Sequence, residues 1–140
     1  MKKLVTLFLA CTLAGAALAG CGGAQEFAVT GRHEAASADG TVRVEDAGGG
    51  NNLVTIHLDN LPPPDRIATG LTTYVVWFVA ANASPVKAAT LVYDADARVG
   101  DAAATTPLTT FEVRVTAERA NTVAAPSESV AITLRVAGES

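Results

Sequence analysis

Cysteine is nearly absent from this chain of 140 residues, and its two copies, Cys11 and Cys21, both lie near the start. Beyond residue 21 the sequence can therefore form no disulfide, no thiolate metal site and no C-x-x-C redox pair. The sequence also lacks a glycine-rich phosphate loop and the G-x-S-x-G motif of a serine nucleophile. The common motifs for nucleotide binding and for nucleophilic hydrolysis are thus missing.

Positive charge is also scarce. The chain has 10 Lys and Arg residues against 14 Asp and Glu residues, a net charge of −4. Setting aside Lys2 and Lys3 at the start leaves 8 basic residues against 14 acidic ones, a net charge of −6. No basic cluster remains, so we expect no nucleic acid partner, because phosphate contacts need Lys or Arg along one face. The acidic balance also disfavours docking of the domain on anionic lipid headgroups.

The first 21 residues have the layout of a secretory signal peptide. Lys2 and Lys3 precede an apolar stretch from Leu4 to Ala19, whose 16 residues fall short of the roughly 20 that cross a bilayer. The stretch ends in Leu18-Ala19-Gly20-Cys21, which resembles the lipobox of bacterial lipoproteins. In that family the peptide is cut before the Cys, whose sulfur carries a diacylglyceryl group. Residues 1–20 are then a leader and Cys21 the lipidated first residue. Ordinary cleavage after Ala17-Leu18-Ala19, or an uncleaved helix, is the less specific alternative.

The lipobox resemblance also implies a position for the mature protein. Lipoproteins carry two or three acyl chains, and since each buried methylene contributes about 0.8 kcal/mol, detachment from the membrane is negligible. We expect an extracytoplasmic protein of the cell envelope, with Gly22 favouring the outer membrane where the cell has one. Residues 21–25 form a tether of on the order of 15 Å, at about 3.3 Å per extended residue. Residues 26–140 form one domain, which sits close to the membrane.

Strand patterns separated by turn residues fill this domain. Apolar residues alternate with polar ones over Thr41–Glu45, Val54–Asp59, Phe111–Glu118 and Val130–Val136, with shorter candidates at Phe27–Thr30, Lys87–Tyr93 and Asp101–Thr105. We interpret residues 94–101 as a turn region and residues 46–51 as a loose hairpin loop. No helix is expected after the leader, because the alanine runs are too short to nucleate one.

The segment Thr73–Ala80 is apolar on both faces, which is typical of a strand in the middle of a sheet. Seven or eight such strands with frequent turns predict an all-β fold, a single immunoglobulin-like antiparallel sandwich. Trp77, on the predicted central strand, is expected to fill the core between the two sheets.

The second half of the domain resembles a known family. The sequences Tyr74-Val75-Val76-Trp77-Phe78-Val79, Pro85-Val86, Ala89-Thr90-Leu91, Phe111-Glu112-Val113, Val115-Thr116-Ala117-Glu118 and Ala125-Pro126-Ser127 are similar to the extracytoplasmic domain of anti-sigma-K factors. The resemblance covers roughly residues 41–136 and implies a sandwich in an extracytoplasmic position that binds or senses without catalysis. Those regulators have a sigma-binding segment and a transmembrane helix before this domain, where this chain has a lipobox. The resemblance therefore does not imply inhibition of a sigma factor.

An acidic turn is the first candidate for chemistry. The spacing of Asp94 and Asp96 matches the start of a calcium-binding loop, and Asp101 supplies a third carboxylate nearby. The match to an EF-hand then fails at three positions: Arg98 stands where the motif has an oxygen ligand, Val99 where it has Gly, and Thr105 where it has Glu. A calcium loop of another type and a solvated turn with Arg98 as counter-charge are the two interpretations. The prolines of residues 62–64 could present a polyproline II ligand, although a rigid connection between strands is the simpler interpretation.

The two histidines are the other candidates. His33 and His57 could bind zinc with Glu34 or Asp59. Ser127, His57 and Asp59 are the residues that a hydrolase could recruit, although nothing in the sequence activates the serine. The simpler interpretation is that His33 and His57 are surface residues without a zinc-binding or catalytic role.

These observations lead to one expected function and two alternatives. We expect a lipid-anchored, non-catalytic β-sandwich, not an enzyme, that uses no cofactor and binds or supports an envelope component. The alternatives are a small envelope hydrolase or metal-dependent enzyme, and a calcium-stabilised adhesive module.

Overall fold

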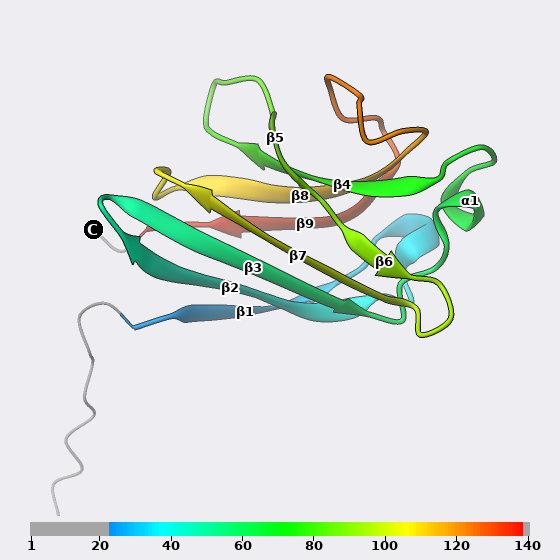
Figure 1. The fold of residues 1–140 in the computed structure, drawn as a ribbon, viewed down its shortest axis with the longest axis horizontal. Coiled ribbons are helices and arrows are strands. Elements are labelled where there is room, and N and C mark those ends of the chain that lie inside the picture. Colours follow the sequence, from blue (N-terminus) through cyan, green and yellow to red (C-terminus); the bar gives the residue numbers. More distant parts are fainter. Residues whose placement is uncertain (1–22, 139–140) are drawn as a thin grey trace, which may run out of the picture.

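Two antiparallel sheets pack face to face in the computed structural model of this chain, which describes residues 23–138 (Figure 1). The predicted leader, Cys21 and Gly22 lie outside the described residues. One sheet has the order β1 (Gln25–Thr30), β2 (Asp39–Gly48), β3 (Asn51–Asp59), β7 (Val99–Thr106) and β6 (Val92–Asp94). The other has the order β5 (Val86–Thr90), β4 (Thr73–Val79), β8 (Phe111–Glu118) and β9 (Val130–Val136). A 3-10 turn, η1 (His33–Ala35), and a one-turn helix, α1 (Pro64–Ile67), complete the described elements.

The strand order is that of an immunoglobulin-like sandwich. β2, β3, β7 and β6 occupy the places of strands A, B, E and D, while β9, β8, β4 and β5 occupy those of G, F, C and C′. β1 is an additional strand that pairs with β2 at the edge of the five-stranded sheet. The prediction of an immunoglobulin-like antiparallel sandwich is therefore confirmed, with nine strands in the described part instead of seven or eight. Within residues 23–138, no helix has the length and hydrophobicity that a membrane crossing requires.

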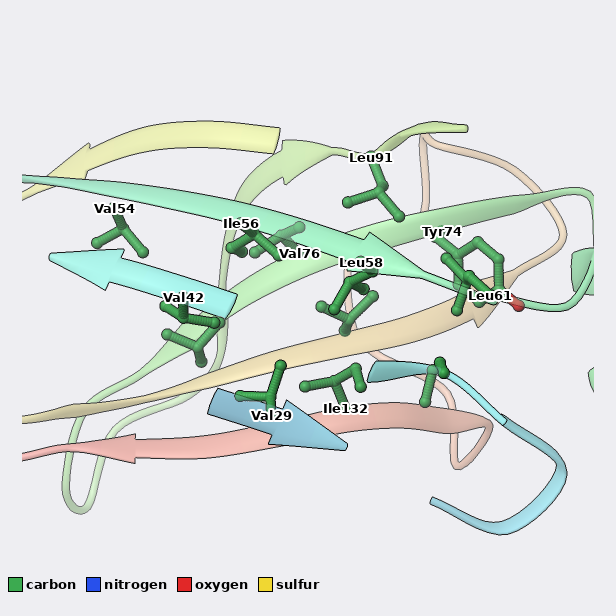
Figure 2. Close-up of a cluster of buried hydrophobic side chains, with 14 of the residues drawn as sticks. Val29, Val42, Val54, Ile56, Leu58, Leu61, Tyr74, Val76, Leu91 and Ile132 are labelled. Atoms are coloured by element: carbon green, nitrogen blue, oxygen red, sulfur yellow. The ribbon is translucent and has the colours of Figure 1, made fainter. Parts of the chain in front are cut away.

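Side-chain alternation explains most of the strands. Val42 and Val44 of β2, and Val54 and Ile56 of β3, point into the core, while their polar neighbours face solvent. Figure 2 shows Val42, Val54 and Ile56 in one apolar cluster with residues from both sheets, and Val44 belongs to the same cluster. The β2–β3 hairpin is tighter than predicted, because both strands continue to the turn. Its three glycines all have positive φ, a conformation that side chains with a Cβ disfavour.

β4 lies between β5 and β8 and is buried on both faces, as its sequence predicted. Tyr74, Val76 and Phe78 join the core cluster between the sheets. Trp77 is also fully buried, but it lies on the opposite face of β4, outside that cluster. The expectation that Trp77 fills the core is therefore wrong. Alternation fixes that Trp77 and Tyr74 face opposite ways, but when both rows are apolar it does not say which row faces inward.

The segment predicted as one strand over Lys87–Tyr93 divides between the two sheets. β5 pairs with β4, whereas β6 pairs with β7 in the other sheet, and Leu91 stands between them. The Leu91 N–H donates to the Tyr74 carbonyl over 2.9 Å, and its side chain is buried. Gly100 of β7 makes room for it, since a Cβ there would lie 2.4 Å from a Leu91 methyl carbon. The chain thus crosses from one sheet to the other at Leu91, whose side chain packs against Gly100.

Residues 94–106 differ from expectation for a related reason. The short strand predicted at Asp101–Thr105 is the full eight-residue β7, and it starts inside the expected turn region. β7 pairs with both β3 and β6, so it lies within the sheet and not at its edge. Its run of three alanines carries little contrast between polar and apolar side chains, so pairing partners determine this strand more than its own pattern does.

Candidate functional site

The sandwich has two distinct ends. β1 begins and β9 ends at one of them, whereas η1, α1 and the β6–β7 turn gather at the other (Figure 1). The nine residues of β3 run between the two ends, a length of about 30 Å at about 3.3 Å per residue. We call the second end the far end, because it lies opposite the start of β1.

A pocket of about 510 Å³ opens at the far end, where the chain passes from β3 into α1. This volume lies in the range of small-ligand sites, roughly 300–1,000 Å³. The pocket is lined by Glu34, Ser37, Pro62, Pro63, Arg66 and Arg98. These residues come from three segments that are distant in the sequence: the η1 region, the proline segment with α1, and the β6–β7 turn. We call this set of residues the far-end pocket.

Two tyrosine hydroxyls form hydrogen bonds with the backbone of the proline segment that lines the pocket. Tyr74 donates from its hydroxyl to the Pro62 carbonyl over 2.6 Å, and Tyr93 donates to the Leu61 carbonyl over 2.7 Å. The two rings meet edge to face with centroids 5.7 Å apart. Figure 2 shows Tyr74 beside Leu61 at one end of the apolar cluster. Burial raises the pKa of both phenols above the ordinary value of 10.0, so both remain protonated donors.

Backbone contacts join the rest of the pocket wall. The Leu61 N–H donates to the Arg98 carbonyl over 2.9 Å, which ties the proline segment to the β6–β7 turn. Arg98 itself has a φ of 57°, so its place in the turn is set by a left-handed backbone. On the other side, the Ser37 hydroxyl donates to the Asn60 carbonyl over 3.0 Å. The three segments are therefore held together by hydrogen bonds that do not involve either guanidinium group.

A second polar cluster lies on the outer face of the five-stranded sheet. The His57 ring contacts two carboxylates: Nδ1 lies 2.6 Å from Oδ1 of Asp101, and Nε2 lies 3.4 Å from Oδ2 of Asp59. The hydrogen bond that His57 donates to Asp101 and the charges of both carboxylates raise the pKa of His57 above its ordinary value of 6.5. All three side chains are 46–60% exposed. The sequence had suggested the contact with Asp59 but not the closer one with Asp101, which comes from β7.

The predicted hydrolytic set is not assembled. Ser127 belongs to the β8–β9 loop, where its hydroxyl donates to the Ala117 carbonyl over 3.0 Å. That loop lies beside the four-stranded sheet, on the side away from the five-stranded sheet (Figure 1). His57 and Asp59 lie on the outer face of the five-stranded sheet, so the whole sandwich separates them from Ser127.

The candidate metal ligands do not form a metal site either. Asp94 accepts hydrogen bonds from the N–H groups of Asp96 and Ala97, which makes it the cap of its own turn, while Asp101 pairs with His57. Between residues 23 and 138, no three His, Cys, Asp or Glu side chains are close enough together to hold a metal ion. Neither the calcium interpretation of Asp94, Asp96 and Asp101 nor a zinc site on the two histidines gains support from this geometry.

The sequence pointed to several residues of the far-end pocket, but it did not predict that they lie together. Glu34 was considered only as a zinc ligand, Arg98 as the counter-charge of an acidic turn, and the prolines as a connection. Arg66 carried no motif. A sequence signal that could have found the site is the Pro-Pro-Pro-Asp-Arg run over residues 62–66, which begins a helix and places Arg66 in its first turn.

Comparison with protein-family models, with curated protein sequences and with solved structures gives no match for this chain. The similarity to the anti-sigma-K domain therefore stays a prediction from the residues that carry it.

Proposed function

We propose that this chain is a lipid-anchored, non-catalytic binding module of the cell envelope, tethered through Cys21, and that its ligand site is the far-end pocket. The observation that carries the proposal is the position of that pocket. The lipobox is followed within a few residues by β1, and β1 begins at the end of the sandwich opposite the pocket. A lipid on Cys21 would therefore turn the pocket away from the membrane that holds the protein.

The architecture of the pocket supports binding. Its wall contains two prolines, whose backbones lose little conformational freedom when a ligand settles on them. The hydroxyl of the buried Tyr74 donates to the Pro62 carbonyl, and that of the partly buried Tyr93 donates to the carbonyl of the preceding residue, Leu61. A site that is ordered before its ligand arrives spends less free energy on ordering, which favours affinity.

Anchoring is tested by labelling cells with an alkyne analogue of palmitate and comparing the wild-type chain with Cys21→Ser. We expect label on the wild-type protein, loss of label in the variant, and release of the variant from sedimented membranes. Ala24→Ser, three residues beyond the lipobox, is the matched control and should label fully. Equal labelling of wild type and Cys21→Ser would contradict the anchoring.

Binding is tested in living cells with a photo-reactive amino acid at Ser37, in the pocket, and at Thr55, on the open face of the five-stranded sheet. Both positions are at the surface. We expect an envelope adduct from position 37 and little or none from position 55. Equal yields at both positions, or none at position 37, would contradict the assignment of the pocket as the ligand site.

A further inference from the structure

The far-end pocket contains two cations, Arg66 and Arg98. In residues 23–138 the arginines in ion pairs are Arg43, with Glu45, and Arg114, with Glu112. Arg66 and Arg98 make no ion pair with a described carboxylate, although they line the same pocket. In a chain with a net charge of −4, two unpaired guanidinium groups at one pocket distinguish that pocket electrostatically.

We propose that the far-end pocket binds an anionic group, a carboxylate or a phosphate, through Arg66 and Arg98. This inference rests on the proposed function, because it names the ligand class of the same site. Guanidinium groups present a planar fork of N–H donors that matches the paired oxygens of either anion. The hydrogen bonds described between the pocket walls come from other groups, although the Arg98 guanidinium lies close enough to the Tyr93 hydroxyl to lower its pKa.

The acidic groups around the pocket narrow the ligand further. Glu34 lines the pocket, and Asp65 and Asp94 are near enough for their charges to act on the Tyr93 hydroxyl. These acidic groups repel a bare multivalent anion more strongly than a ligand with one or two separated negative groups, so inorganic phosphate should bind more weakly than a ligand of the second kind. A volume of about 510 Å³ accommodates a molecule the size of a disaccharide or a short peptide. The headgroups of the anchoring membrane are not the source, because the pocket is at the other end of the sandwich.

The test uses the full-length acylated chain in micelles of a neutral detergent, with binding measured by isothermal titration calorimetry. The probes are digalacturonate, its uncharged dimethyl ester and inorganic phosphate. We expect digalacturonate, phosphate or both to bind and the ester not to bind. Binding of digalacturonate alone identifies a carboxylate as the natural group, and binding of phosphate alone identifies a phosphate.

Variants assign the binding to the two arginines. Arg66→Gln and Arg98→Gln should each weaken the anion about tenfold or more, as expected for the loss of a charge-assisted hydrogen bond, and the double variant should abolish binding. Arg43→Gln, on the outer face of the five-stranded sheet, is the matched control and should change nothing. Glu34→Gln should tighten binding a few-fold, because it removes a repelling charge. Thermal unfolding of each variant verifies that it folds.

Two outcomes would overturn the inference: no binding of any anionic probe at 10 mM, or equal binding of digalacturonate and its ester. Weakening by Arg43→Gln as strong as that by Arg66→Gln would also overturn it. The photo-crosslinking experiment keeps the two proposals apart. An adduct at position 37 without anion binding removes the anionic ligand but leaves the binding module, whereas the absence of that adduct removes the binding module itself.

Discussion

The outer faces of the two sheets carry comparable polar clusters in opposite environments. On the five-stranded sheet, His57, Asp59 and Asp101 form an open cluster in which each side chain is 46–60% exposed. On the four-stranded sheet, the Trp77 indole donates to the Thr116 hydroxyl over 2.8 Å, and that hydroxyl donates to Glu118 over 2.7 Å. Trp77 and Thr116 are fully buried and Glu118 is 4% exposed, so this second set is a covered cluster.

The β8–β9 loop, residues 119–129, makes the difference. The Ser127 N–H donates to the same Glu118 oxygen over 2.7 Å, and Lys87 of β5 donates to the Asn121 carbonyl over 2.6 Å. The loop is thus fastened to the outer face of the four-stranded sheet by hydrogen bonds at two places. Each cluster contains a short hydrogen bond, 2.6 Å between His57 and Asp101 and 2.7 Å between Thr116 and Glu118, but the two bonds contribute unequally to stability. A polar group left unpaired in a buried site costs about 1–3 kcal/mol, whereas an exposed ion pair contributes about 0.2–1 kcal/mol.

The largest loss of stability is expected when the apolar side chain of the covered cluster, Trp77, is removed. Trp77→Ala should lower the free energy of unfolding by about 3–5 kcal/mol, because it leaves a cavity and removes the indole N–H that donates to the Thr116 hydroxyl. Thr55→Ala, on the open face, should change it by less than about 0.5 kcal/mol. Urea denaturation of the full-length chain measures both. Similar losses in the two variants would show that the faces are energetically alike.

The next largest loss of stability is expected at Glu118, the carboxylate of the covered cluster, and it is compared with the loss at Asp101 in the open cluster. Glu118→Ala should cost about 1–3 kcal/mol, because Thr116 and the Ser127 N–H lose their shared acceptor. Glu118→Gln keeps a carbonyl oxygen at that position and should retain most of the stability. Asp101→Ala in the open cluster should cost less than about 1 kcal/mol. If Asp101→Ala proves the more damaging of the two alanine variants, the comparison fails.

A smaller loss of stability is expected when the β8–β9 loop that covers this cluster is loosened. Ser127→Ala removes the donor to the Ala117 carbonyl and the acceptor of the Ser129 N–H, and should cost about 1 kcal/mol. Amide hydrogen exchange should speed up in residues 119–129 and stay unchanged in the β2–β3 hairpin, which belongs to the other sheet. Faster exchange throughout the chain would indicate a global loss of stability instead of local opening.

The smallest effect is a pH dependence that belongs to the open cluster alone. Both ring nitrogens of His57 face carboxylates, and only the protonated ring can donate to both. Since folding raises the pKa of His57, its stabilisation is complete below the unfolded value of 6.5 and is lost as pH rises through the folded pKa. After solvent screening we expect a change of about 0.2–1 kcal/mol. Unfolding measured from pH 5.5 to 8 should show it in the wild type but not in His57→Gln.

Alternating strands were the part of the fold that the sequence predicted well. β2 and β3 bury one row of side chains, and in the first half of β8 one row is more buried than the other, so the contrast between rows defines the strand and its inner face. The direction of Trp77 and the extent of β7 were not predictable in this way. Trp77 sits in a strand with two apolar rows, and the alanines of β7 give no contrast. Which row faces inward depends on how distant strands pair.

The far-end pocket could not have been predicted for a different reason. Glu34 lies between β1 and β2, Arg98 lies between β6 and β7, and Pro62 lies on the connection from β3 to β4, so their proximity depends on how the strands are arranged in the sandwich. The contact of Asp101 with His57 is a simpler case. It follows directly from the pairing of these two residues across β3 and β7, a register that periodicity within one strand does not contain.

The position of β1 has a mechanical consequence. β1 starts at the end of the sandwich opposite the pocket, and its six residues pair antiparallel with β2 along their length. Under the proposed anchoring, a ligand pulled away from the membrane would load the domain along its strands. The hydrogen bonds between β1 and β2 would then share the force in shear and would not open one after another, so this edge strand would act as a clamp between anchor and cargo.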